Sequence, residues 1–338
     1  RLDRTHHKVA RGGLGTLFRY GDRLGYAPLR HRLVRRLADV GIDAHPQQIV
    51  LTHGANEAMD LIVRYFVPPG GVVLIDDPGY YPLRGKLHLA GARVVGVPRM
   101  ADGPDLQALE HALKTLRPRL FFTQSLAHNP TGSDVSLAKA RAVLHLAEQH
   151  NLLLVENDVL SDFRPATSPR LSALDGLERT LYLGSFSKSL SAALRVGFVA
   201  CSPDLAQELA DLKVLTGVNS SEYAERAVET LLAERRYPRH LEQLRGKLAE
   251  ATHSAYALLD RMGAEVFVRP SHSLFIWARW PDFADAQALA QAMLGEGIVM
   301  APGNIFCVDS EASCAWSRCN PHAVLDPRFA RALERLRG

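Results

Sequence analysis

Between residues 46 and 200 the sequence alternates short apolar runs with helical patterns, and this alternation restricts the fold more than any other feature. The runs predict strands at Ile49–Leu51, Val72–Ile75, Arg93–Val97, Leu120–Thr123, Leu152–Val155, Thr180–Leu183 and Val196–Ala200. Helices are predicted between most of them, at Glu57–Phe66, Tyr81–Leu89, Asp105–Leu116 and Leu137–Gln149. This order is typical of an α/β fold with a mainly parallel seven-stranded sheet sandwiched by helices.

Beyond Ser202 the pattern changes to longer helices followed by short strands, which predicts a smaller α+β domain. Helices are expected at Pro203–Leu215, Glu222–Glu234, Pro238–Met262, Ala284–Leu294 and Pro327–Leu336, and strands at Glu265–Val268 and Leu274–Ala278. Three parts are therefore predicted. Residues 1–45 form an N-terminal segment that belongs to the small domain and the dimer contact, residues 46–215 the large domain, and residues 216–338 the C-terminal small domain.

Composition excludes several classes of protein. The net charge of +4 is modest and the arginines are spread along the chain, so nucleic-acid binding by these residues is not expected. No apolar stretch reaches membrane-spanning length and no leader pattern is present. The four cysteines form no C-x-x-C pair, so we expect reduced thiols in a cytoplasmic protein and no metal site. The chain starts at Arg1 without a methionine, which leaves room for an upstream segment.

A lysine between small hydroxyl residues follows the apolar run that ends at Leu183. Lys188 is preceded by Ser185 and Ser187, and Arg195 follows before the next apolar run. A lysine at the mouth of a buried sheet loses its proton more readily, and the neutral amine can form a Schiff base with a carbonyl compound. The serines and the arginine can hold an anion. A surface lysine in a serine-rich turn explains these residues equally well.

Three further motifs follow predicted strands, at the edge where α/β sheets bind ligands. Thr52-His53-Gly54-Ala55-Asn56 opens a helix, Pro78-Gly79-Tyr80-Tyr81 forms an aromatic turn, and Asn129-Pro130-Thr131-Gly132 is a second turn. Their positions support one shared site. Taken singly, each is also explained as a helix start or a packed turn.

Together, the S-F-S-K and L-R-V-G-F strings and these three motifs resemble the fold-type I aminotransferases that use pyridoxal 5′-phosphate (PLP). The similarity covers nearly the whole chain and is closest to the aminotransferase-like domain of MocR-type regulators in the GntR superfamily and to their free-standing relatives. It implies PLP as the cofactor, an amino acid and a 2-oxo acid as small-molecule partners, and a homodimer.

The resemblance also assigns roles to residues. Lys188 would form the Schiff base and move the substrate proton. The cofactor phosphate would be held by Gly54, Ala55, Asn56, Ser185, Ser187 and Arg195, and by Tyr20 reaching across the dimer. Tyr80 would stack on the cofactor ring, with Tyr81 as the alternative. Asn129 would bind the ring hydroxyl oxygen, and the Asn129–Pro130 bond is expected to be cis.

Ser317-Arg318-Cys319-Asn320 resembles the strand in which the family binds the substrate carboxylate. Arg318 would hold that carboxylate with two donors, beside Asn129. Ala301-Pro302-Gly303-Asn304-Ile305-Phe306 matches the family's turn just before it. Without the resemblance, Arg318 reads as an ordinary surface arginine.

The segment after Val155 departs from the family pattern. Relatives have an aspartate against the ring nitrogen and a tyrosine near the ring hydroxyl, whereas this chain has Asn157 and Leu160 there. Asparagine has no charge to stabilise a protonated ring, so we expect weaker ring chemistry. Asp158 could replace the missing charge only if the strand end slips by one residue.

Two main functions follow, and a third, weaker one is a fold-type I enzyme with other PLP chemistry that needs no charged ring partner. The first is a PLP-dependent aminotransferase that uses Lys188. The alternative is a PLP- and amino-acid-sensing effector domain of a MocR-type transcriptional regulator, with little turnover, whose winged-helix part would lie upstream and bind the DNA.

Overall fold

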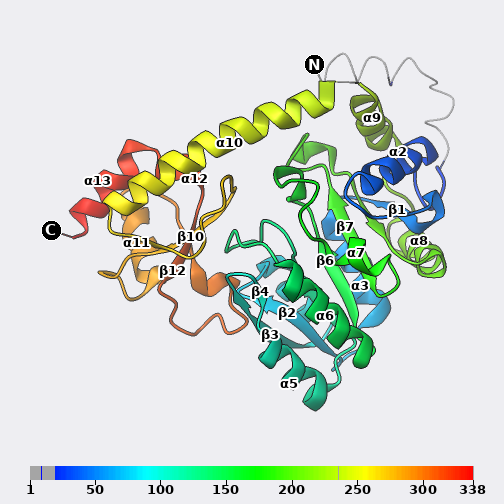
Figure 1. Ribbon diagram of the computed structural model, residues 1–338, viewed down its shortest axis with the longest axis horizontal. Helices are drawn as coiled ribbons and strands as arrows, with labels where there is room; N and C mark the ends of the chain where they lie inside the picture. The colour runs from blue at the N-terminus through cyan, green and yellow to red at the C-terminus, as the bar shows by residue number, and fades with distance from the viewer. Residues whose placement is uncertain (1–8, 10–19, 235, 338) are drawn as a thin grey trace.

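Two sheets joined by a long helix make up the computed structural model, which describes residue 9, residues 20–234 and residues 236–337 (Figure 1). The large sheet has eight strands in the order β1-β8-β7-β6-β5-β2-β3-β4. Their bounds are β1 Ile49–Thr52, β2 Val72–Asp77, β3 Arg93–Met100, β4 Gly103–Pro104, β5 Leu120–Thr123, β6 Leu153–Asn157, β7 Thr180–Ser185 and β8 Gly197–Ala200.

The centre of this sheet is parallel, as predicted. Strands β3, β2, β5, β6 and β7 pair in parallel, whereas β8 is antiparallel to both of its neighbours, β7 and β1. All seven predicted strands are present, and the two-residue β4 is added at one edge. The parallel strands end at one side of the sheet, so the segments that follow them can gather into one site.

Helices cover both faces of the large sheet because its strands are apolar on both sides. Val73 and Ile75 pack with α3, α4 and α8, while Leu74 between them packs with α5, α6 and α7. Burial of a side chain of this size contributes roughly 1.5–3 kcal/mol. The helix bounds are α3 Ala55–Phe66, α4 Tyr81–Leu89, α5 Leu106–Leu116, α6 Leu137–Gln149, α7 Leu171–Asp175 and α8 Pro203–Gly217.

A third apolar cluster covers the edge formed by β1 and β8. Helix α2 (Ala27–Ala38) presents Leu29, Leu33 and Leu37 to it, at the helical spacing read from the sequence. Helix α9 (Glu222–Ala233) adds Val228 to the same cluster. The predicted domain boundaries at residues 46, 215 and 216 remain a proposal.

Helix α10 (Arg236–Arg261) runs from this region to the small sheet (Figure 1). Pro238 lies in its first turn, where a missing N–H group costs nothing. The small sheet has the order β11-β12-β10-β9 and buries its own apolar cluster, which includes Trp280 and Phe329. Its elements are β9 Glu265–Val266, β10 Ile276–Arg279, α11 Ala286–Gly295, β11 Ala301–Pro302, β12 Trp316–Cys319, α12 Pro321–Val324 and α13 Pro327–Arg335. Within the described ranges, none of the helices combines the length and apolar character needed to cross a membrane.

Candidate active site

The start of α3 and the start of β8 form a cradle of closely packed backbone. A Cβ atom added to Gly197 would lie only 2.5 Å from Ala55 N. Only glycine at position 197 therefore allows the two segments to approach this closely. Gly54 caps α3 with a φ of +75° and no side-chain hydrogen bond. The free N–H groups of this first helical turn favour an anion, and Asn56 in the same turn is exposed.

Arg195 faces this helix start from the other side. A Cβ atom on Gly54 would lie 2.7 Å from Arg195 Nη2, which also donates to His53 O at 3.3 Å. Arg195 Nη1 donates to Ser187 Oγ at 3.4 Å, and Ser185 Oγ donates to Ser187 Oγ at 3.2 Å. The structure therefore brings together the residues predicted to hold a phosphate, except Tyr20. Lys188 directly follows Ser187 and is exposed.

A pocket at the ends of β2, β5 and β6 contains the predicted ring-binding residues. Tyr80, Asn129 and Asn157 all line it, together with Met59 and Gln124. Burial raises the pKa of the Tyr80 phenol, and the charges of Arg195 and Arg318 partly offset this, which places both arginines near the same ring. The Oδ1 atom of Asn157 is buried without a hydrogen-bond partner among the described residues. A buried oxygen without a hydrogen bond lowers the stability of the fold unless a bound group donates a hydrogen bond to it.

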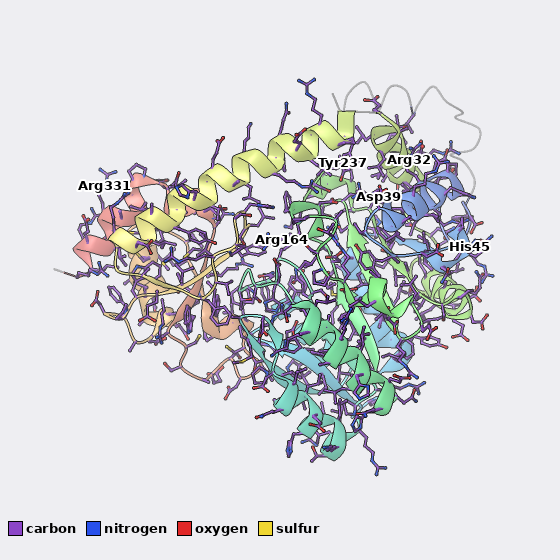
Figure 2. All side chains as sticks on the ribbon, in the orientation of Figure 1. Arg32, Asp39, His45, Arg164, Tyr237 and Arg331 are labelled. Carbon is purple, nitrogen blue, oxygen red and sulfur yellow. The ribbon has the colours of Figure 1, made fainter. Side chains whose placement is uncertain are left out.

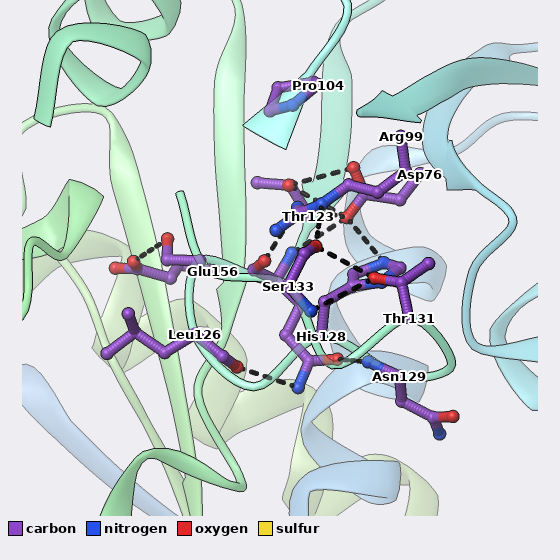
Figure 3. A network of polar contacts seen from close by, with 12 residues as sticks. Asp76, Arg99, Pro104, Thr123, Leu126, His128, Asn129, Thr131, Ser133 and Glu156 are labelled. Atoms are coloured by element: carbon purple, nitrogen blue, oxygen red, sulfur yellow. Dashed lines mark hydrogen bonds and ion pairs between the residues drawn. The ribbon is translucent and has the colours of Figure 1, made fainter. Parts of the chain in front are cut away.

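The loop that carries Asn129 is fixed by a buried polar network (Figure 3). The carboxylate of Asp76 accepts a hydrogen bond from Thr123 Oγ1 at 2.9 Å and pairs with Arg99 at 3.5 Å. His128 Nε2 lies 3.4 Å from the same carboxylate, and its Nδ1 lies 2.8 Å from Thr131 Oγ1. Burial and the charge of Arg99 lower the pKa of His128 to about 4. The imidazole is therefore neutral near pH 7 and holds the turn by hydrogen bonds alone.

Asn129 is held at both its backbone and its side chain. Its N–H donates to Gln124 Oε1 at 3.1 Å, and its peptide bond to Pro130 is cis, which confirms the expectation from the sequence. Its Oδ1 accepts a hydrogen bond of 2.9 Å from Arg318 Nη1. The structure thus joins the predicted ring pocket to the predicted carboxylate-binding arginine.

Arg318 projects from β12 between two aromatic rings. Its guanidinium carbon lies 4.5 Å from the centroid of Phe275 and 4.8 Å from that of Phe306. Burial lowers its pKa, and the nearby Tyr81 and Tyr80 hydroxyls act in the opposite direction. An arginine desolvated in this way binds a planar carboxylate more strongly than an exposed one does.

The structure does not bring Asp158 to this pocket. Its carboxylate accepts hydrogen bonds from Arg170 Nε at 2.8 Å and from Tyr182 OH at 2.7 Å, among residues lining a separate pocket. The strand end has not slipped, so the side chains of Asn157 and Asp158 point to opposite sides, as alternation along β6 requires. Leu160 is buried against Phe163 and Leu248 and offers no hydroxyl group.

Tyr20 also lies away from these residues within one chain. It is 85% exposed, in a hollow formed with residues 217–223. The role predicted for Tyr20 places it in the site of a second subunit, and that role remains a prediction.

Sequence reasoning missed several residues of this site. Gln124, Arg99 and Phe275 were not predicted, although each contacts a predicted residue or its loop. Gln124 directly follows the apolar run of β5, and a polar residue at that strand end could have identified it. Arg99 and Phe275 have no comparable signal, because only the tertiary fold brings them close.

A parallel sheet with a lysine between β7 and β8, a glycine cradle and an arginine facing it defines a fold-type I transferase. Comparison with solved structures agrees. LysN, the alpha-aminoadipate aminotransferase of Thermus thermophilus, crystallised with N-(5′-phosphopyridoxyl)-L-leucine, has a TM-score of 0.89 at 28% identity. The match covers 99% of this chain and 88% of that chain. An archaeal alanine:glyoxylate aminotransferase shares the fold with a TM-score of 0.90 at 24% identity, over 99% of this chain and 86% of its own.

The chain belongs to the aminotransferase class I and II family, whose sequence profile matches residues 4–336. The 2-aminoadipate transaminase of Thermus thermophilus is 32% identical over 294 residues, which are 85% of this chain and 72% of that relative. The uncharacterised HTH-type transcriptional regulator YdcR of Escherichia coli is 33% identical over 299 residues, or 87% of this chain. This chain spans only 63% of that regulator.

The protein is accordingly a PLP-dependent aminotransferase. The residues present fit this cofactor. The cradle at Gly54 and Gly197 admits an anion and excludes a side chain, and the unpartnered Asn157 Oδ1 offers a polar atom to a ring.

Proposed function

We propose that this chain transfers the amino group of an amino acid to a 2-oxo acid, with Lys188 as its catalytic residue and Arg318 as the carboxylate-binding residue. The observation that carries the proposal is the 2.9 Å hydrogen bond from Arg318 to Asn129 at the pocket that Asn157 also lines. It supports a substrate whose carboxylate lies beside the ring-binding pocket.

Six residues would hold the phosphate within one chain, and two asparagines and a tyrosine would hold the ring. The first set is Gly54, Ala55, Asn56, Ser185, Ser187 and Arg195, and the second is Tyr80, Asn129 and Asn157. When bound, PLP supplies an aldehyde that exchanges amino groups and a ring that withdraws electrons from the substrate. Lys188 would hold the cofactor and then move the proton of the substrate α-carbon through its Nζ atom.

The first test is the absorbance spectrum of the purified protein with PLP, before and after addition of amino acids. A band of covalently bound cofactor is expected in the wild type and not in Lys188→Ala. The panel begins with 2-aminoadipate, the amino acid in the name of one relative, and includes leucine and glutamate. Release of the matching 2-oxo acid supports the proposal, and binding without release contradicts it.

Arg318→Lys separates substrate recognition from cofactor binding. Lysine keeps the positive charge but lacks the planar pair of donors that matches a carboxylate. We expect KM for the amino acid to rise by about tenfold or more, with the cofactor band unchanged. An unchanged KM would contradict the proposed role of Arg318 in binding the substrate carboxylate.

A sensor of amino acids is the second candidate function, and the uncharged Asn157 is the observation that favours it. A regulatory domain needs to bind PLP and an amino acid but does not need rapid turnover. In the experiment above, a spectral change that stops without release of a 2-oxo acid would support this function, as would a native reading frame with a winged helix upstream.

We also propose a homodimer, because the role predicted for Tyr20 requires a second subunit. A cytoplasmic location remains a prediction that rests on the reduced state expected for the four cysteines.

A further inference from the structure

Two of the four cysteines lie close together beside the candidate site. Cys307 and Cys314 occupy a loop of residues 307–315, between the short 3₁₀ helix η5 (Gly303–Phe306) and β12. Phe306, immediately before the loop, and Arg318, shortly after it, form one wall of the candidate site. The loop therefore connects two elements that the proposed function uses.

Both sulfur atoms lie against the same residue. Cys307 Sγ donates to Gly303 O at 3.5 Å, and a Cβ atom on Gly303 would lie 2.6 Å from Cys314 Sγ. The neighbouring thiol is also the first cause of the pKa shift of each cysteine. Cys201 and Cys319, in contrast, are buried in apolar clusters.

The pKa values of the two thiols are shifted in opposite directions. The interaction with Cys307 lowers the pKa of Cys314 to about 7, while the same contact and burial raise the pKa of Cys307. Both cysteines are partly exposed. The thiolate is the reacting species, and the lowered pKa of Cys314 favours it as the thiol that attacks first.

We propose that Cys307 and Cys314 are a redox-active pair that closes to a disulfide when the protein meets a small disulfide such as oxidised glutathione. The Cys314 thiolate attacks one glutathione sulfur and releases the first glutathione thiolate. Cys307 then gives its proton to solvent and attacks Cys314 Sγ, which releases the second glutathione. The protein loses two protons and two electrons, and one glutathione disulfide becomes two thiols. The bond ties the turn that bears Phe306 to the strand that bears Arg318.

The test is peptide mapping of the full chain loaded with PLP, after incubation with oxidised glutathione and blocking of the remaining thiols. Glu311 lies between the two cysteines, so a protease that cleaves after glutamate separates them unless a disulfide joins the fragments. We expect the joined fragments in the oxidised protein and separate fragments after reduction. Separate fragments with glutathione retained on Cys314, or a bond between two chains, would overturn the proposal.

Three variants serve as controls. Cys201→Ala removes a buried thiol outside the loop and should leave the bond intact. Cys307→Ser and Cys314→Ser should each abolish it, and Cys307→Ser should retain glutathione on Cys314. Closing so short a loop should also raise the melting temperature by roughly 3 to 6 °C in the wild type alone. If the melting temperature stayed unchanged in wild-type protein with the disulfide fully formed, the bond would not stabilise the turn that bears Phe306 against the strand that bears Arg318. Because the mapping requires no amino-acid turnover, failure of the proposed function would not alter its outcome.

Discussion

At the scale of single residues, the main difference from the family pattern is Asn157, which replaces an aspartate. Its side chain lines the pocket, and its Oδ1 atom has no hydrogen-bond partner among the described residues. Of the two acidic residues next to it in the sequence, Asp158 is paired with Arg170, and Glu156 accepts hydrogen bonds from the N–H groups of Leu171 and Ser172. In the proposed site, the ring would therefore have a neutral partner. A protonated ring nitrogen beside an asparagine is less stable than one beside a carboxylate, so a cofactor bound there would withdraw electrons from the substrate more weakly.

Asn157→Asp should increase transamination. A hydrogen bond to a charged partner contributes about 1.5–3 kcal/mol, against about 1 kcal/mol for a neutral one, so kcat should rise by about tenfold. The measurement is release of 2-oxo acid at saturating amino acid. Asn151→Asp makes the same change of charge on an exposed turn and should have no effect. An Asn157→Asp protein with the kcat of the wild type would show that the ring partner does not limit the reaction.

His128 should make the fold sensitive to acid. Its pKa is lowered to about 4 by burial, so below pH 6.5 the unfolded chain takes up a proton that the folded chain does not. This contribution to stability is present at pH 7 and is lost as the pH falls from about 6.5 to 4. Between pH 7 and pH 5 it removes about 2 kcal/mol from the free energy of unfolding.

In His128→Gln this loss should disappear, since glutamine does not titrate. Denaturant unfolding of both proteins at pH 7 and pH 5 provides the measurement, and the difference between the two proteins isolates the histidine. Equal losses in both proteins would mean that His128 is already protonated, or exposed, in the folded state.

At the scale of elements, the start of α10 is bound to the loop that carries Lys188. Tyr237, in the first turn of α10 (Figure 2), has its hydroxyl 3.0 Å from Ser189 Oγ and 3.1 Å from Asp162 Oδ2. One turn later, His240 Nε2 lies 2.9 Å from Ser189 O. Ser189, the residue after Lys188, is thus held at its side chain and at its backbone by a helix that continues to the small sheet.

Tyr237→Phe should loosen this loop. Loss of one buried hydroxyl costs about 1 kcal/mol of local stability, so amide hydrogen exchange at residues 186–190 should accelerate about fivefold. Tyr256→Phe removes a hydroxyl from the same helix where it bonds Pro270 O at 3.2 Å. That variant should affect the small sheet only. If residues 186–190 exchanged at equal rates in both variants, the Tyr237 hydroxyl would not be what restrains the loop that carries Lys188.

Prediction from sequence succeeded for strands and helices long enough to show their own hydrophobic periodicity. The central strands, and the helices α3, α4, α5 and α6 between them, were predicted to within a few residues, because parallel strands are apolar on both faces. The five-residue helix α7 was not predicted. The short strands β4 and β11 were missed, since two residues contain no periodicity. In the site, residues after strand ends were predictable. The pairing of Asp76 with Arg99 was not, because 23 residues separate them in the chain.

At the scale of the whole molecule, the prediction for Tyr20 can be tested by mixing subunits. Tyr20→Phe and Lys188→Ala each disable every site of a homodimer if Tyr20 serves the partner's site. A mixed dimer would then contain one intact site, with Lys188 from one chain and Tyr20 from the other. Mixing equal amounts should restore about a quarter of the wild-type activity.

The activity is measured at PLP concentrations too low to fill the Tyr20→Phe homodimer. If Tyr20 acted within its own chain, every mixed dimer would contain one site lacking Lys188 and one lacking Tyr20, and activity would not return. Mixing wild-type chains with Lys188→Ala chains provides the reference for exchange of subunits.

The length of α10 has a mechanical consequence. Its 26 residues extend about 39 Å as one uninterrupted rod, with the lysine loop bonded near one end and the small sheet packed near the other. A lever of this length turns a tilt of about 5° into a displacement of about 3 Å at its far end. A substitution on the remote surface of the small sheet can thus reach the lysine loop without changing a single contact in the pocket.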